Sequence, residues 1–316
     1  MKDDLIFSLN ATLPIFIIMI FGWAVRRIGL LDDHSTAQIN KFVFRTLLPA
    51  LLFMDLSTAD FRAVWDGGYV LFCMAATVLS VGIAVLFSLL HRDRCERGEV
   101  IQACYRSSAA VLGIAFVNNI YGKSTVAALM IVGTVPLYNI IAVTVLSVTS
   151  PDRSGKHGRA LILSTLRGIA TNPIILGIIA GILWSVTGVD QPVIMSKSIS
   201  YLGNMATPLS LIALGASVRF GEAKGYAGLT FGIAGMKLLF FCGIFLPVAI
   251  HTGYRGEKLI SILVMLGSAT TGSCFVMAKS QGHKGDITAF AVMLTTLCSA
   301  FTLTMWLFIL KTRGYI

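Results

Sequence analysis

The segment TNPIILGIIAGIL, Thr171–Leu183, matches the segment TLPIFIIMIFGWA, Thr12–Ala24, at a constant separation of 159 residues. The same separation gives nine identities between residues 11 and 57, which are Ala11/Ala170, Thr12/Thr171, Pro14/Pro173, Ile15/Ile174, Ile20/Ile179, Gly22/Gly181, Gly29/Gly188, Pro49/Pro208 and Leu52/Leu211. A weaker series at a separation of 160 runs from Ser108/Ser268 to Thr144/Thr304. Because 159 is almost half of the 316 residues, the second half is expected to be a copy of the first.

The composition indicates a membrane protein. Apolar residues make up 56% of the chain and charged residues only 13%, against about 25% in soluble domains. So few charges could not cover the surface of a soluble protein of this size, so the expected surroundings are the lipid bilayer. The net charge of +10 fits basic cytoplasmic loops, and no nucleic-acid partner is expected.

Apolar runs of about 20 residues, separated by short polar loops, predict ten transmembrane helices. They cover residues 6–26, 36–57, 67–90, 99–121, 125–149, 166–187, 193–217, 225–250, 258–281 and 286–310. One set of alternating loops holds more Lys and Arg than the other loops and the termini together, which places that set in the cytoplasm. The chain is therefore expected to be a multi-pass protein of the plasma membrane (the inner membrane of a bacterium) with both termini outside.

The odd number of spans in each copy decides the geometry of the repeat. Residues 1–160 and residues 161–316 form two units of five predicted helices, so the second unit starts on the opposite side of the membrane. Inverted repeats of this kind are common in secondary transporters, whose two halves open alternately to either side. The alternative is a duplication retained only for packing.

The fourth and ninth predicted helices are rich in small polar residues at membrane depth. The two stretches are RSSAAVLGIAFVNNIYG, Arg106–Gly122, and GSATTGSCFVMAKSQG, Gly267–Gly282. We expect both helices to be broken there, because interrupted helices survive in a membrane only around a cavity or inside protein. Their exposed N–H groups and hydroxyls could hold a carboxylate or an ion. The candidate ligands are Ser108, Asn118, Asn119, Ser268, Thr270, Thr271 and Ser273. The alternative is that these small residues only allow close helix packing.

Three more residues are candidate substrate ligands. Lys237 lies about twelve residues into the eighth helix, where a lysine costs about 2.5–3.5 kcal/mol and should face a cavity or a partner. Arg106 could attract an anionic substrate or snorkel toward the cytoplasm. Asn139, deep in the fifth helix, needs a polar partner and could face the fourth helix.

Other charged residues are expected at the membrane surfaces. Lys41 and Arg45 share a face near the cytoplasmic end of the second helix and are expected to snorkel there. Asp55 lies at the other end of that helix and is expected at the outer interface. No acidic residue is then expected where the fourth and ninth helices cross, which disfavours a cation site built from carboxylates.

The sequence lacks the common motifs of ATP-driven transport and of hydrolysis. No phosphate-binding GxxxxGK[ST] loop, Gx[ST]xG elbow or HExxH motif occurs, and the five histidines are too scattered to predict a metal site. No cofactor is expected, and H⁺ and Na⁺ both stay open as the coupling ion. Pro49 and Pro208, which correspond in the repeat, are expected to kink the second and seventh helices.

The chain resembles the bacterial members of the auxin efflux carrier family. The resemblance rests on stretches in a matching order: LPIFIIMIFGWAVRRIGLLDD, TLLPALLF, RSSAAVLGIAFVNNIYG, VPLYNIIAV, NPIILGIIAGIL, ATPLSLIALGAS and FVMAKSQGHKGD. It implies an all-α fold similar to that of bile acid/sodium symporters, in which helices 4 and 9 break and cross at the centre. It also implies a scaffold of helices 1, 2, 6 and 7, often dimeric, and a moving unit of helices 3–5 and 8–10.

The chain departs from this family at the expected crossing. Relatives often carry proline there, whereas this chain has Ala115 in the stretch GIA and no proline in ATTGS. The breaks are therefore expected to depend on Gly113 and Gly272, assisted by neighbouring hydroxyl groups.

Taken together, the sequence predicts a secondary active transporter of a small organic anion and not an enzyme. The resemblance implies a dicarboxylate such as malonate or malate, or an auxin-like carboxylate. The alternatives are a channel and a membrane-embedded enzyme that modifies lipids.

Overall fold

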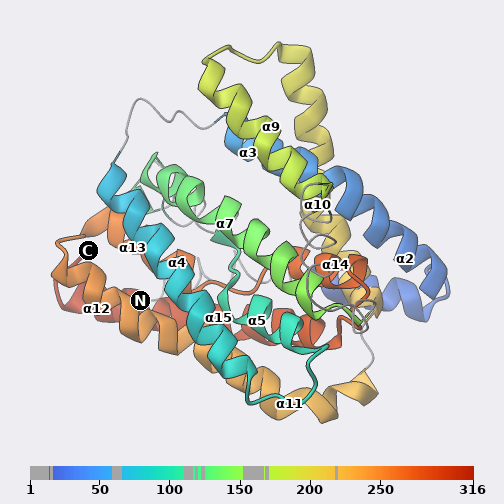
Figure 1. Cartoon of the computed structure of the whole chain (residues 1–316). Coiled ribbons are helices and arrows are strands. Elements are labelled where there is room, and N and C mark those ends of the chain that lie inside the picture. The colour runs from blue at the N-terminus through green and yellow to red at the C-terminus, as the bar shows by residue number, and fades with distance from the viewer. Residues whose placement is uncertain are drawn as a thin grey trace.

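The computed structural model describes most of the chain (Figure 1). The described residues are 17–58, 66–109, 125–151, 171–217 and 220–316, with the single positions 14, 117, 120, 121 and 167. Every regular element within these residues is a helix. The helices are α2 (Asp33–Phe42), η1 (Val43–Leu47), α3 (Leu48–Ser57), α4 (Gly67–Ser88), α5 (Arg97–Tyr105), α7 (Thr125–Thr149), α9 (Pro173–Thr187), α10 (Val193–Ser217), α11 (Phe220–Gly235), η4 (Met236–Phe240), α12 (Phe241–His251), α13 (Gly256–Gly267), α14 (Ser273–Ser280) and α15 (Asp286–Thr312).

Five described helical stretches are long and apolar enough to cross a bilayer. They cover Gly67–Ser88, Leu129–Thr149, Val193–Ser217, Gly225–His251 and Asp286–Thr312, which lie within about three residues of five predicted spans except at the start of Leu129–Thr149. The chain is thus an all-helical, multi-pass membrane protein. The other predicted spans contain shorter helices, and those at 99–121 and 258–281 include the interruptions described below.

Local signals in the sequence explain several helix boundaries. The Asp32 carboxylate accepts a hydrogen bond from the Ser35 N–H at 2.7 Å, and the Asp66 carboxylate accepts one from the Tyr69 N–H at 3.0 Å. These side chains satisfy N–H groups that the first turn of a helix leaves unpaired. Asn172 caps α9 in the same way, directly before Pro173 at its first position.

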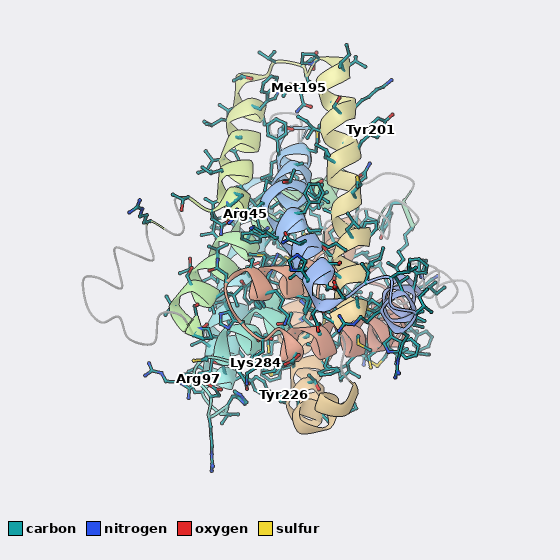
Figure 2. All side chains as sticks on the ribbon, turned by 90° about the vertical axis from the view of Figure 1, so that its right-hand side faces the viewer. Arg45, Arg97, Met195, Tyr201, Tyr226 and Lys284 are labelled. Atoms are coloured by element: carbon teal, nitrogen blue, oxygen red, sulfur yellow. The ribbon has the colours of Figure 1, made fainter. Side chains whose placement is uncertain are left out.

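The helices α9 and α10 both pack against α3 to form one group, and the upper parts of α9 and α10 project beyond the other helices in Figures 1 and 2. Glycines allow this close approach. A methyl group at Gly181 would come within 2.9 Å of the Phe53 carbonyl oxygen, and one at Gly22 would overlap the Ile212 carbonyl. At the separation of 159 residues, Gly22 corresponds to Gly181, and Phe53 corresponds to Ile212. The two contacts are therefore counterparts within the repeat.

The second group contains α4, α5, α7, α11–η4–α12, α13 and α15, and α14 contacts both groups. Buried hydrogen bonds hold it together at the start of α5. The Glu99 carboxylate accepts hydrogen bonds from the Gly285 N–H at 2.8 Å and from the Thr288 N–H at 3.1 Å. These bonds tie α5 to the beginning of α15, 186 residues away in the chain.

The elements η1 and η4 are π-helical turns within longer helices. The turn η1 ends directly before Leu48 and Pro49, and Pro49 lacks the N–H that a regular helix would use. Pro208 lies inside α10, which stays helical on both sides of it. The sizes of the predicted kinks at these prolines stay predictions. The second π-helical turn, η4, contains Lys237.

Candidate functional site

Both polar stretches that were predicted to break contain interruptions. The helix α5 ends at Tyr105, and Arg106 has extended backbone angles of φ −73° and ψ 128°. The helix α13 ends at Gly267, Ser268 is extended at φ −76° and ψ 161°, and α14 begins at Ser273. The expectation of interrupted helices in these two stretches is confirmed.

The two interruptions lie against each other. The Ser108 N–H donates to the Ala269 carbonyl at 2.9 Å, and the Thr270 hydroxyl donates to the Ala103 carbonyl at 2.8 Å. The Thr270 N–H in turn donates to the Thr295 hydroxyl at 3.0 Å. These contacts supply partners for backbone groups that lose their helical hydrogen bonds, which is necessary where water is excluded.

The observed breaks correct the prediction of which residues allow them. Gly272 has a φ of −59°, an ordinary right-handed value, so the break does not use the conformational freedom of glycine there. Instead, hydroxyl and carbonyl groups from the opposing segment satisfy the extended backbone. A methyl group at Gly272 would lie 3.0 Å from the Leu211 side chain, so close packing is the constraint at this position. Gly113, Asn118 and Asn119 lie outside the described residues.

A small, partly open cavity of about 70 Å³ lies at the crossing. Its walls come from α3, α7, α10, α14 and the interrupted segments, and so from both groups of helices. The polar residues most relevant to a ligand are Asp55, Arg106, Ser108, Asn139, Thr271 and Ser273. Five of these six were predicted as candidate ligands from the sequence. Thr270 and Ser268 are buried nearby, and among the described residues the Ser268 hydroxyl has no hydrogen-bond partner.

Arg106 provides the positive charge of this cavity. Its side chain is buried, and Nη2 donates to the Asn139 Oδ1 at 3.0 Å and to the Ser273 Oγ at 3.2 Å. Nη1 contacts the sulfur of Met277 at 2.7 Å. The described residues give Nε no partner and place no carboxylate in an ion pair with the guanidinium. Neutral contacts therefore orient a charge that they do not neutralise, and a carboxylate is the natural ligand for it.

Lys237 was expected to face a cavity or a partner, and in the structure it contacts a partner. It is fully buried and lies outside the residues that line the central cavity, and its Nζ donates to the Tyr105 carbonyl at 3.0 Å. Tyr105 is the last residue of α5, so the ammonium group lies at the negative end of a helix dipole. The contact supports the interrupted end of α5 from behind the cavity.

Asp55 is the cavity residue that the sequence analysis misplaced. It was expected at the outer interface, but its side chain lines the central cavity together with Arg106. The expectation that no acidic residue lies at the crossing was therefore wrong. Depth counted along one helix does not reveal how far a cavity between other helices extends. A useful signal was present, because Asp55 follows Pro49 and a polar side chain in an apolar helix is costly.

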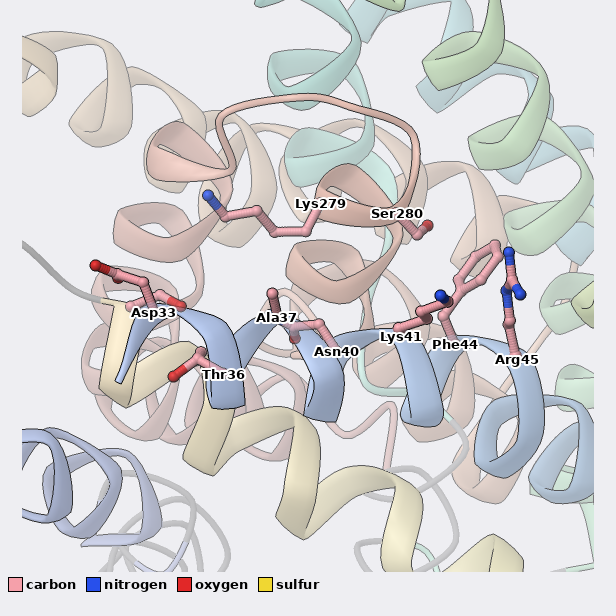
Figure 3. Close-up of a pocket in the computed structure, with 10 residues that line it drawn as sticks. Asp33, Thr36, Ala37, Asn40, Lys41, Phe44, Arg45, Lys279 and Ser280 are labelled. Carbon is pink, nitrogen blue, oxygen red and sulfur yellow. The ribbon is translucent and has the colours of Figure 1, made fainter. Parts of the chain in front are cut away.

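A larger cavity of about 470 Å³ lies between α2–η1, the end of α10 and α14 (Figure 3). Lys41 and Arg45, which were expected to snorkel, line it from one side and Lys279 from the other. All three side chains are exposed. The Asn40 Oδ1 in its wall has no hydrogen-bond partner within the part of the chain that the structure describes. This cavity is larger and more basic than the central one.

Charged loops join the elements at one end of the second group. Burial by itself raises the pKa of Glu96, but hydrogen bonds from Tyr226, His91 and Lys284 outweigh it and hold the pKa below its usual value. The Tyr226 hydroxyl lies 2.8 Å from Glu96 and the Lys284 ammonium 3.2 Å. Figure 2 shows Tyr226, Lys284 and Arg97 at the end of the molecule opposite Met195.

Comparison with known proteins identifies relatives over nearly the full chain. The model of the family described as "Membrane transport protein" matches residues 7–307. An "Uncharacterized transporter" of Methanothermobacter thermautotrophicus is 20% identical over 305 residues, which cover 95% of this chain and 97% of the relative. A protein of Rhizobium meliloti named "Putative malonate transporter" is 22% identical, with 95% of this chain and 94% of the relative covered.

A third relative, the "Uncharacterized transporter YfdV" of Escherichia coli, is 19% identical, with 96% of this chain and 98% of the relative covered. All three relatives are named transporters, and the family match extends across both halves of the chain. The resemblance seen in the sequence is thereby confirmed. The chain belongs to the membrane transport protein family, that is, the auxin efflux carrier family.

Proposed function

We propose that this membrane transport protein is a secondary active transporter that moves a small organic anion by alternating access. The observation that carries this proposal is the guanidinium of Arg106, which is buried at the crossing and oriented by Asn139 and Ser273. A permanently charged group without a described carboxylate partner favours an anionic ligand at that point. The extended backbone beside it comes from two segments 167 residues apart, so relative movement of these segments would reshape the site.

The size of the central cavity supports a small substrate. Its volume of about 70 Å³ has room for roughly five water molecules, since one needs about 10–15 Å³ on this measure. A short dicarboxylate such as malonate or malate fits this space better than an auxin-like aromatic acid. The name of the Rhizobium meliloti relative, which refers to malonate, points to the same class of substrate.

Two inverted five-helix units, residues 1–160 and 161–316, are proposed to exchange roles during transport. The paired contacts Gly22–Ile212 and Gly181–Phe53 support this arrangement, because a twofold axis converts one contact into the other. The close packing of α9 and α10 against α3 supports their assignment, with the first helix, to a scaffold (helices 1, 2, 6 and 7). The rest (helices 3–5 and 8–10) would form the moving unit.

The surroundings of the protein follow from the same proposal. The plasma or inner membrane would hold the chain with both termini outside. Apolar side chains on α9 and α10, among them Leu176, Leu183 and Tyr201, are exposed and would face lipid or a second copy in a homodimer. Either H⁺ or Na⁺ could supply the energy, and no cofactor is needed.

The test is transport by the purified protein in sealed liposomes. Radiolabelled malonate, malate, succinate, lactate and indole acetate are offered with and without a sodium gradient or a pH gradient. We expect saturable uptake of a short carboxylate, accelerated by unlabelled substrate on the opposite side. A flux that does not saturate and shows no exchange would instead indicate a channel. Chemical conversion of added phospholipid without anion flux would indicate a lipid-modifying enzyme.

A further inference from the structure

The central cavity contains opposite charges that come from the two groups of helices. Asp55 belongs to α3, in the group proposed to be the scaffold, and Arg106 follows α5 in the other group. Both line a cavity of about 70 Å³. Ionisable residues inside a membrane are costly and usually mark a functional site, so this pair calls for an explanation that includes both members.

The Asp55 carboxylate has no hydrogen bond or ion pair to any residue in the described ranges. The elements packed against α3 are α9, α10 and η1. The helix α9 has no ionisable side chain, and α10 contributes Lys197 and Tyr201, which are exposed. The turn η1 contributes Arg45, which lines the larger cavity instead.

The helices across the cavity add one more titratable group. Tyr138 of α7 lines the cavity, but its hydroxyl is engaged with Ser107 and with the Met265 carbonyl at 3.1 Å. On α14, Cys274 is buried and Lys279 lines the larger cavity. No Asp, Glu, Lys or Arg occurs in the sequence between Arg106 and Lys123. Arg106 is therefore the charge that shares the cavity with Asp55 in the described structure.

A substrate carboxylate changes the charge balance of this cavity. When the cavity is empty, Asp55 is the acidic group and Arg106 the basic group in its lining. An anion that binds Arg106 brings a second negative charge beside Asp55, and like charges in a site of low dielectric repel strongly. A proton on Asp55 removes this repulsion and leaves the carboxyl group able to donate a hydrogen bond to the anion.

We propose that Asp55 takes up one proton from water when a substrate carboxylate binds Arg106, so that the anion and the proton are bound and released together. This inference rests on the proposed function, and it adds the identity of the coupling ion and of the residue that carries it. The proton moves from the open aqueous side to a carboxylate oxygen of Asp55, and no bond of the substrate breaks. When the anion leaves on the other side, Asp55 releases the proton there.

The same geometry disfavours Na⁺ as the coupling ion at this site. A sodium ion needs several oxygen ligands, and it would lie in the same small cavity as the fixed positive charge of Arg106. A proton, by contrast, neutralises the carboxylate without requiring additional ligands. The proposal thus predicts coupling to a pH gradient without a requirement for sodium.

The experiment counts protons by calorimetry of malonate binding to the purified protein. Titrations in buffers of different ionisation enthalpy, at pH values where free malonate is a dianion, give the number of protons taken up per malonate. We expect close to one for the wild type, with the malonate Kd rising by about tenfold per pH unit above the range where Asp55 titrates. The Asp55→Asn variant should bind malonate with no proton uptake and with less than about twofold change per pH unit.

Two further variants make the outcome decisive. Asp55→Glu keeps a carboxylate and should retain the proton uptake, whereas Asp190→Asn, a change in the exposed loop before α10, should behave as the wild type. If the wild type takes up no proton, or if Asp55→Asn takes up as many as the wild type, the role of Asp55 is refuted. If Asp55→Asn does not fold, a wild type without proton uptake still decides against the role of Asp55, and so does a folded Asp55→Glu variant that binds malonate without proton uptake.

The failure of this inference can be told apart from a failure of the proposed function. If neither malonate nor another short carboxylate binds the wild type, or if Arg106→Gln binds it normally, the anion site itself is wrong. If binding depends on Arg106 but proton uptake does not depend on Asp55, only the coupling inference fails.

Discussion

The central cavity and the larger cavity beside α2 both carry positive charge, but they hold it in different ways. Arg106 is buried, and Asn139, Ser273 and Met277 fix the direction of its guanidinium. Lys41, Arg45 and Lys279 are exposed side chains around a space of about 470 Å³. A buried and oriented charge can select one ligand geometry, whereas exposed charges attract anions over a longer range with little selection. The comparison suggests a site for recognition and a vestibule for attraction.

The largest expected effect separates these two roles. Arg106→Gln removes the only described charge with which the central cavity can attract an anion, and it should weaken malonate binding by about 30-fold or more, equivalent to ~2 kcal/mol. Arg106→Lys keeps the charge but loses the planar fork, so it should recover only part of the affinity. Calorimetry and liposome uptake measure both effects. Normal malonate uptake by Arg106→Gln would show that the central cavity does not recognise the anion through Arg106.

Lys237 is buried outside both cavities, so it tests whether malonate binding depends on where a positive charge lies or only on its presence. Lys237→Met removes the donor to the Tyr105 carbonyl, and it should lower the free energy of unfolding by about 1–3 kcal/mol. Because Lys237 does not line the central cavity, the malonate Kd of the folded variant should stay within about twofold. Thermal unfolding and calorimetry give the two numbers. A large loss of malonate affinity at unchanged stability would instead indicate that Lys237 takes part in substrate binding.

The larger cavity should show a smaller effect that depends on salt. Replacing Lys41, Arg45 and Lys279 together by Gln should raise the KM for malonate by about two- to fivefold at low ionic strength. The difference should disappear near 1 M salt, where the screening length is about 3 Å. Initial rates of uptake at several salt concentrations measure it. A difference that persists at high salt would indicate direct binding of the substrate in this cavity.

The smallest expected effect concerns a charge cluster outside both cavities. The pKa of Glu96 is lowered in the folded protein, so its contribution to stability is present above the unfolded pKa and is lost as pH falls through the folded pKa. Glu96→Gln should therefore unfold at a lower temperature than the wild type near neutral pH, and the difference should shrink in acid. Thermal unfolding across pH tests this, with malonate affinity expected to stay unchanged.

Much of the fold and part of the site could be predicted from the sequence. The apolar lengths predicted the five spans that the structure describes, and the polar stretches predicted both interruptions at Arg106–Ser108 and Ser268–Thr271. Arg106, Asn139 and Ser273 were predicted separately as candidates, and the structure brings both Asn139 and Ser273 within hydrogen-bond distance of Arg106. These successes share a cause, because the cost of burying polar groups in lipid acts on each short segment by itself.

The position of Asp55 and the role of Lys237 could not be predicted in this way. The sequence of the helix that carries Asp55 or Lys237 reveals how deep the residue lies in the membrane. It does not reveal which other helices end or cross beside that residue. Whether Asp55 meets the outer interface or a cavity depends on Arg106 and Thr271, which approach it from distant parts of the chain. Whether Lys237 meets a substrate or a helix end depends on α5 ending at Tyr105.

By itself, the sequence determined that this chain is a helical membrane protein and where two of its helices cannot remain regular. Those properties follow from the transfer of each segment from water to lipid, which depends on local composition. Only the tertiary structure decided which charges share a cavity and which lie behind it. Electrostatic interactions depend on the distance between groups and on the dielectric around them, and the crossing of separate helices sets both.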